Sequence, residues 1–229
     1  MASRRQSEEY MDLSPLWITC KVAFTATVIA TILAVPLAAL VGSMKRGKRI
    51  IDTLLSLPLV LPPTVVGFFL LILFGFNSAV GRFFDRIGID IIFTVKGAVI
   101  ASVVVALPII YRPARAAFEQ IDQDLIDAAR LMGYVRFRLF IKVYVPLCFS
   151  EIVTGVILAF ARSIGEFGAT IMVAGNIPGR TRTMSVAVYT AMQSGNRTLA
   201  YQWTAIILCM SFVVLLILDL LAGKQFKKQ

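Results

Sequence analysis

The chain of 229 residues is too apolar for a water-soluble domain, since 58% of its residues are hydrophobic and only 16% are charged. Soluble domains have about half of their residues apolar and about a quarter charged. Several apolar runs reach or exceed the roughly 20 residues that a helix needs to cross a bilayer. The composition therefore predicts an integral membrane protein.

The net charge of +10 does not indicate a nucleic-acid partner, because Lys and Arg sit in short loops between apolar runs. That distribution is the one that orients spans in a membrane. The sequence has no histidine, and Cys20, Cys148 and Cys209 lie inside apolar runs without metal-ligand spacing. We interpret them as small buried hydrophobes and expect no metal site.

The apolar runs predict an all-α, polytopic membrane protein with about five transmembrane helices. Residues 11–222 make one membrane domain, with spans at about 13–41, 51–74, 91–111, 143–174 and 203–222. The polar segment 1–10 is either a disordered tail or an upstream extension of a chain that starts at Met11. Residues 223–229 form a basic tail.

Basic loops predict the orientation of these spans. The loop 45–49, the segment 112–142 and the C-terminal tail fall on one side and hold more Lys and Arg than the other side. Because basic loops stay in the cytoplasm, we expect the C-terminus inside and the N-terminus outside a cell (plasma or inner) membrane.

The segment 112–142 contains a predicted short helix. Asp122 or Asp124 can cap it, and Gly133 can end it. It is either an amphipathic helix on the membrane surface or a docking helix whose small Ala128-Ala129 face enters a groove on a soluble partner.

Residues in and after this helix resemble the "EAA" loop of ATP-binding cassette importer permeases. Asp127-Ala128-Ala129, Gly133 and Val145-Pro146 follow its spacing, with Asp for Glu and Val for the usual Ile and Leu. The resemblance implies a cytoplasmic coupling helix that fits a cleft on a separate ATPase subunit. The residues it assigns to ATPase coupling are Asp127, Ala128, Ala129, Met132, Gly133 and Pro146.

Two further stretches resemble molybdate permeases: the run 57–67, with Pro62-Pro63-Thr64, and the run 160–183. The resemblance implies a pore-forming, non-enzymatic permease subunit that works as a homodimer with an ATPase and an extracytoplasmic oxyanion-binding protein. Molybdate is the expected substrate, and tungstate and sulfate permeases of the same family are the alternatives.

Other features favour a transport pathway or a dimer interface, although packing within one chain explains them equally well. Prolines kink a span, an Arg and a Glu four residues apart can pair on one helix face, and small residues allow close helix contact. The residues concerned are Pro62, Pro63, Thr64, Arg162, Ser163, Gly165, Glu166 and Gly168. Arg180 and Arg182 either dock the binding protein or lie in a solvated loop.

The sequence has no Gly-x4-Gly-Lys-Ser/Thr loop, so we expect no cofactor on this chain and ATP used by the partner subunit. An intramembrane enzyme using Glu151, Glu166 or Asp219 is a rival, but no carboxylate pair, His or Ser-Lys arrangement supports it. It would turn over without ATPase partners. An ion-coupled carrier, the other rival, would transport without ATP.

Overall fold

The computed structural model describes residues 12–44 and 46–226, and its regular elements over these ranges are all helices. The predicted all-α fold is confirmed. The predicted polar tail, residues 1–10, lies outside the described residues, as do 227–229 of the basic tail.

Three helices are long and apolar enough to cross a bilayer: α1 (Ser14–Gly42), α5 (Val95–Glu119) and α12 (Arg197–Phe226). Two further pairs of helices pass the same test but are bent, and the number of spans is five if each pair counts as one. The helix of the third predicted span continues to Glu119, eight residues past the predicted end at 111. The last helix begins early because the Asn196 side chain accepts a hydrogen bond from the backbone N–H of Leu199 at 3.1 Å.

The first bent pair shows that the predicted second span, 51–74, is no straight rod. It consists of α2 (Lys48–Ser56), a 3-10 turn (Leu57–Leu59) and α3 (Pro63–Phe74), which turn through 110°. Pro62 and Pro63 have no N–H to continue the helix, and Pro62 instead precedes the first turn of α3.

The predicted fourth span, 143–174, is also divided. The helix α7 (Arg136–Leu139), a π-helical turn (Phe140–Tyr144) and α8 (Val145–Leu147) meet α9 (Phe149–Ile164) at 76°. Pro146 in α8 removes a backbone donor close to this bend. The chain breaks again after Ile164, and α10 (Gly168–Ala174) is a separate short helix.

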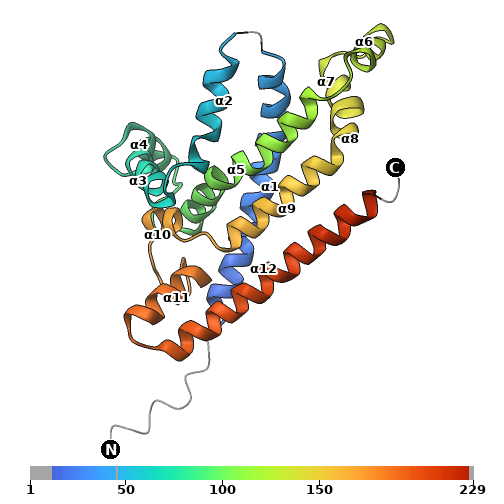
Figure 1. Ribbon diagram of the computed structural model, residues 1–229. Helices are drawn as coiled ribbons and strands as arrows, with labels where there is room; N and C mark the ends of the chain where they lie inside the picture. The colour runs from blue at the N-terminus through green and yellow to red at the C-terminus, as the bar shows by residue number, and fades with distance from the viewer. Residues whose placement is uncertain (1–11, 45, 227–229) are drawn as a thin grey trace, which may run out of the picture.

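The core lies where α1, α5 and α9 pack against one another (Figure 1). Small residues on α1 and α5 are buried completely, among them Ala26, Ala30, Ala34 and Ala114. Gly155 of α9 allows an equally close approach, since a Cβ there would come within 3.2 Å of the Cα of Ile110. Small side chains at these contacts let helix backbones come together without a bulky layer between them.

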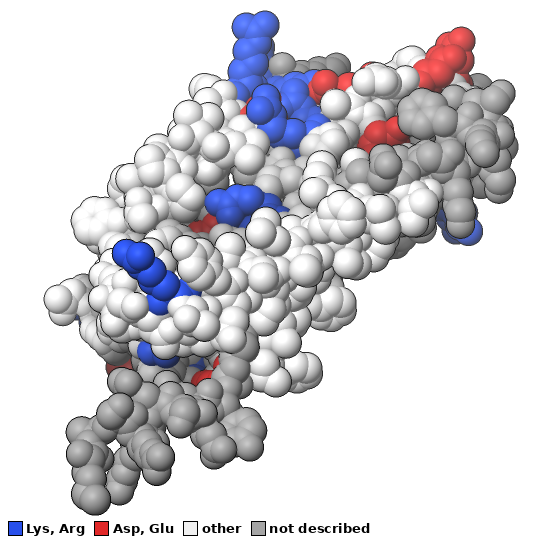
Figure 2. Space-filling model, turned by 60° about the horizontal axis from the view of Figure 1, so that its bottom comes forward, with Lys and Arg blue, Asp and Glu red and all other residues white. Residues whose placement is uncertain are grey.

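The two ends of the bundle differ. The helix α6 (Gln123–Leu131) and the turn between α1 and α2 lie at one end, and α11 (Met184–Gln193) lies at the other (Figure 1). Figure 2 shows a broad, mostly uncharged band on that face, interrupted near its middle by a group of basic atoms with acidic atoms beside it. A membrane-embedded surface needs such a band.

The short helices α3 and α10 pack against each other and against α5, and α4 (Ala79–Arg86) lies beside α3. The contact depends on Gly67, where a Cβ would lie 2.8 Å from both the Cα of Ala169 and the Cβ of Met172. Real Cβ atoms do not come so close, so the backbone of α10 occupies the space of the missing side chain.

We therefore expect Gly67→Ala to lower the free energy of unfolding by about 1–3 kcal/mol through overpacking. The measurement is SDS-induced unfolding of the purified chain in mixed micelles. The matched control is Gly42→Ala, because a Cβ at Gly42 meets nothing within 4 Å. Equal stability of the two variants would contradict the close contact of α3 with α10.

Candidate coupling helix and transport pathway

The predicted short helix exists and ends as expected. Asp122 accepts a hydrogen bond from the N–H of Asp124 at 2.9 Å and so caps α6. At the other end Gly133 has φ 82°, and Tyr134 N–H donates to the carbonyl of Ala129 at 3.1 Å. This Schellman-type ending satisfies carbonyls that would otherwise lack a partner and fixes where the chain turns back.

The two alanines of α6 have different environments. Ala129 is only 3% exposed and packs with Ile126 and Leu139, against which Tyr134 also lies. Ala128, by contrast, is exposed, as is Asp127, which pairs with Arg130 at 2.8 Å. Of the Ala128-Ala129 face, only Ala128 is available to a partner in this structure.

Large apolar side chains surround the tip of α6 and are exposed. Leu131 is 90% exposed and Phe137 is 73% exposed, and Met132 is also exposed. Leu125 and Val135 extend this surface, which we call the apolar tip (Leu125, Leu131, Met132, Val135 and Phe137). An exposed apolar surface of this kind is typical of a contact with another protein or with a membrane. Of these five residues, only Met132 was among the predicted coupling residues.

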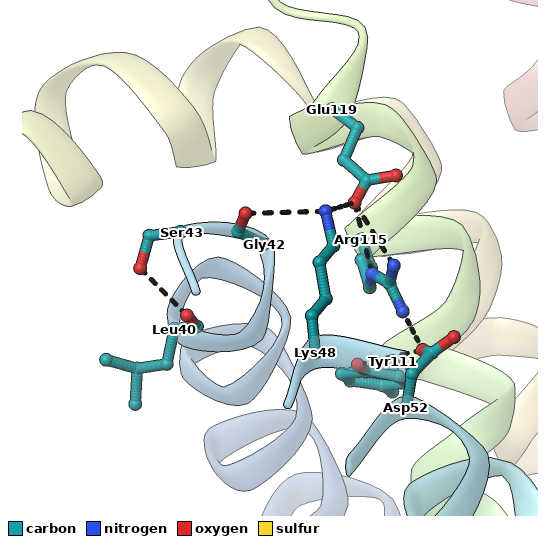
Figure 3. A network of polar contacts seen from close by, with 8 residues as sticks. All are labelled: Leu40, Gly42, Ser43, Lys48, Asp52, Tyr111, Arg115 and Glu119. Atoms are coloured by element: carbon teal, nitrogen blue, oxygen red, sulfur yellow. Dashed lines mark hydrogen bonds and ion pairs between the residues drawn. The ribbon is translucent and has the colours of Figure 1, made fainter. Parts of the chain in front are cut away.

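A network of charged groups ties α2 to α5 near the same end (Figure 3). Arg115 forms an ion pair with Asp52 and donates from Nε and Nη2 to Glu119 Oε1, both at 3.2 Å. Lys48 Nζ lies 2.5 Å from Glu119, and the hydroxyl of Tyr111 donates to Asp52 at 3.0 Å. The network fixes the first half of the bent pair α2–α3 to the helix that leads into α6. It was not predicted.

Arg162 and Glu166 form the predicted ion pair, with Arg162 Nη1 2.8 Å from Glu166 Oε2. The Glu166 side chain is 2% exposed and the Arg162 side chain 38% exposed. The second carboxylate oxygen, Oε1, accepts a hydrogen bond from the N–H of Ala169 at 2.9 Å. Glu166 therefore joins the end of α9 to the start of α10, where a negative charge is also favoured by the helix dipole.

The glycines beside this pair have different surroundings. A Cβ on Gly168 would come within 3.0 Å of Pro63 Cβ and of the backbone nitrogen of Thr64. At Gly165 the first such atom is 3.9 Å away. The structure thus brings Pro63, Thr64, Glu166 and Gly168 together at one junction within a single chain, which we call the α3–α10 junction.

Other predicted residues lie at or near this junction. The carbonyl of Pro62 accepts a hydrogen bond from the N–H of Val65 at 2.9 Å, at the start of α3. Ser163 is buried in the last turn of α9. Pro146 is far from them along the chain, exposed at the bend before α9.

The two outer arginines are not equivalent. Arg182 Nε donates to Asn176 Oδ1 at 2.7 Å, and Asn176 in turn donates to the hydroxyl of Thr190 at 2.9 Å. Arg182 is therefore held by its own loop. Arg180 is exposed and has no ion pair or side-chain hydrogen bond within the described part of the chain.

Comparison with known families decides the class of this protein. Residues 23–227 match the family described as binding-protein-dependent transport system inner membrane component. The chain belongs to this family. It is therefore a transport component of the membrane and no enzyme, as the sequence predicted.

Named relatives of this inner membrane component match over most of its length. YvgM of Bacillus subtilis (strain 168) is 46% identical over 199 residues, which cover 84% of this chain and 88% of YvgM. ModB of Escherichia coli (strain K12), a molybdenum transport system permease protein, is 39% identical over 91% of this chain and 94% of its own. CysT of Synechocystis sp. (strain ATCC 27184 / PCC 6803 / Kazusa) is a sulfate transport system permease protein. It is 33% identical to this chain, and the match covers 76% of this chain and 61% of CysT.

A solved structure shares the fold. A chain in the crystal structure of a bacterial alginate ABC transporter, in complex with an alginate pentasaccharide-bound periplasmic protein, has a TM-score of 0.75 to this chain. The match covers 96% of this chain and 80% of that one at 14% identity. The inner membrane component thus keeps this fold at low sequence identity.

The ion pair at the α3–α10 junction gives a stability prediction. Arg162→Met leaves the buried carboxylate of Glu166 without a cation, and we expect a loss of about 3 kcal/mol in unfolding free energy, the low end for breaking a buried pair. Arg162 is partly exposed, which limits the effect. SDS-induced unfolding measures it.

The double variant Arg162→Met with Glu166→Gln is the matched control. It also removes the negative charge of Glu166, which the single variant leaves without a partner. The Gln side chain can still accept the hydrogen bond from the N–H of Ala169. We expect it to regain at least half of the lost stability. If the double variant is as unstable as the single one, the pair does not stabilise the junction as described.

Proposed function

We propose that this chain is the pore-forming subunit of an ATP-driven importer for molybdate. The observation that supports molybdate as the substrate is the similarity of this chain to ModB of Escherichia coli. The match covers 91% of the chain and leaves no large region unmatched. The runs 57–67 and 160–183, which resemble molybdate permeases, lie at the α3–α10 junction and its flanks.

Sulfate and tungstate are the alternatives within the class. Two sulfate permeases are less similar than ModB of Escherichia coli, at 33% and 35% identity against 39%, and they match 76% and 90% of this chain. Tungstate has nearly the size and charge of molybdate, and a permease of this kind leaves most of the selection to a separate binding protein. Uptake competition between the three oxyanions by the assembled importer ranks them directly.

The apolar tip supports docking of an ATPase subunit. The sequence lacks a phosphate-binding loop of its own. A separate polypeptide must then hydrolyse ATP, and it needs a rigid element to move. The capped helix α6 is such an element, and Leu131 and Met132 are apolar groups that a cleft on the partner would cover.

The two ends of the bundle support the orientation that the sequence predicts, with the N-terminus outside and the C-terminus in the cytoplasm of the cell membrane. The basic turn between α1 and α2 lies at the same end as α6 (Figure 1). The opposite end carries α11 and the loop with Arg180, which would face the extracytoplasmic binding protein.

The pathway is proposed to run beside the α3–α10 junction of two copies of the chain. Arg162 is partly exposed and could meet an oxyanion, while Glu166 weakens its field. Weak attraction suits a pathway, because tight binding would prevent release. Gly168 packs within one chain, so the second copy must use other surfaces.

The docking of α6 can be tested by cross-linking in the assembled importer, with Cys20, Cys148 and Cys209 replaced by Ala. A reagent that joins thiols to amines should link Met132→Cys to the ATPase subunit in high yield, because Met132 is 68% exposed. Ala129→Cys is the matched control on the same helix, and its buried side chain should give little product.

Equal yields from the two positions, or no product from Met132→Cys in an importer that still transports, would exclude the apolar tip as the contact. Transport of labelled molybdate by the same preparation tests the substrate separately.

A further inference from the structure

A cavity of about 700 Å³ lies between the first half of α1, the start of α5 and the loop from α10 to α11. Three cations from these three places line it: Lys21, Lys96 and Arg180. Thr25, Thr94 and Thr181 add hydroxyl groups. We call this cavity the basic vestibule.

Among the described residues, no carboxylate lines the basic vestibule. Within the described residues, none of its three cations has an ion pair, whereas Lys48, Arg115, Arg130 and Arg162 all do. Asp85 and Asp90 line an adjoining cavity of about 260 Å³, which shares five lining residues with the vestibule: Phe74, Phe84, Ile89, Ile91 and Thr94. Three positive charges therefore share one cavity, and the acids closest to it in the described part of the chain line the neighbouring cavity and form no ion pair with them.

Two of the cations occupy places that a purely structural role does not favour. Lys96 lies in the first turn of α5, where the helix dipole is positive and disfavours a cation. Lys21 interrupts the apolar helix α1, and a charge within a span is unfavourable unless it faces water or an anion. A bound anion would compensate both charges.

The walls strengthen the positive field. Much of the lining is apolar and comes from Ile29, Phe74, Phe84, Phe93 and Val99. Low-dielectric walls focus the field of charges in a cleft and raise the local concentration of counter-ions. The vestibule is wide and open compared with a small ion, so it would hold one weakly and through water.

We propose that the basic vestibule is a weak binding site for a small tetrahedral oxyanion carrying two negative charges. The site belongs to the end of the molecule away from α6, since α1 begins there and the loop before α11 contributes Arg180 (Figure 1). This proposal adds a binding site to the proposed function, and it rests on the proposed function for the identity of the natural ligand. Its use is to collect the oxyanion before the pathway, where weak binding permits release.

The electrostatics can be measured without transport. In reconstituted full-length chain with Cys20, Cys148 and Cys209 replaced by Ala, Thr25→Cys places one thiol in the lining. An anionic methanethiosulfonate reagent should react faster than a cationic one. Lys21→Gln, Lys96→Gln and Arg180→Gln together should lower that rate ratio roughly tenfold, within the range that focused fields produce.

The matched control removes the same charge elsewhere, with Arg82→Gln, Arg86→Gln and Arg197→Gln, three exposed positions that do not line the vestibule. It should leave the ratio within about twofold of the parent value. An equal fall in both triple variants would overturn the proposal.

Occupancy is tested in vesicles of phosphatidylcholine alone, with sodium molybdate or sodium sulfate against sodium chloride at equal ionic strength. Slower labelling of Thr25→Cys with either oxyanion, lost in the vestibule variant, supports the site. Slowing that occurs only with added phosphatidylglycerol assigns the vestibule to lipid headgroups, and slowing by an oxyanion-free binding protein assigns it to a protein surface. Either result overturns the proposal, as does no protection at all.

These labelling rates require neither ATPase nor uptake. If the chain fails to import molybdate but the rates behave as expected, the proposed function is wrong and the anion site stands. If uptake is normal and the rates are insensitive to the three cations, only the vestibule is wrong.

Discussion

The structure depends on giving partners, inside the protein, to the backbone groups freed where helices break and to the buried charges. The hydrocarbon of a bilayer offers these groups no hydrogen bonds. Two of the five apolar segments are bent or broken. The break at Pro62 and the break after Ile164 meet at the α3–α10 junction, whereas the 76° bend before α9 lies away from it along the chain. Glu166 satisfies the start of α10 and the charge of Arg162 at once. Gly67 and Gly168 let the short helices α3 and α10 pack closely against each other.

A contiguous set of contacts joins this junction to the apolar tip. The helix α5 ends at Glu119, and α6 begins four residues later at Gln123. Arg115 and Glu119 of α5 hold α2 through Asp52 and Lys48 (Figure 3), and α2 leads through the bend at Pro62 into α3. A displacement of α6 by a partner would therefore act on elements that are bonded, step by step, to the proposed pathway.

The sequence predicted what depends on local spacing. The cap at Asp122, the end at Gly133 and the pairing of Arg162 with Glu166 all follow from residues within four or so positions of each other. Long-range packing could not be predicted in this way: Tyr111 reaches Asp52 59 residues away, and Leu139 decides that Ala129 is buried while Ala128 is exposed. The prolines predicted a kink but not its angle of 110°, nor the packing of α3 on α10 at Gly67, since α10 is about a hundred residues away in the sequence.

The central claim is that α6 presents its apolar tip to an ATPase in the cytoplasm while α11 faces the outside. Labelling with a membrane-impermeant maleimide tests it most directly, using two exposed methionines changed one at a time to Cys, Met132 near α6 and Met192 on α11. The account predicts labelling of Met192→Cys in intact cells, and of Met132→Cys only in inside-out vesicles stripped of ATPase. Labelling of Met132→Cys from outside intact cells would contradict it.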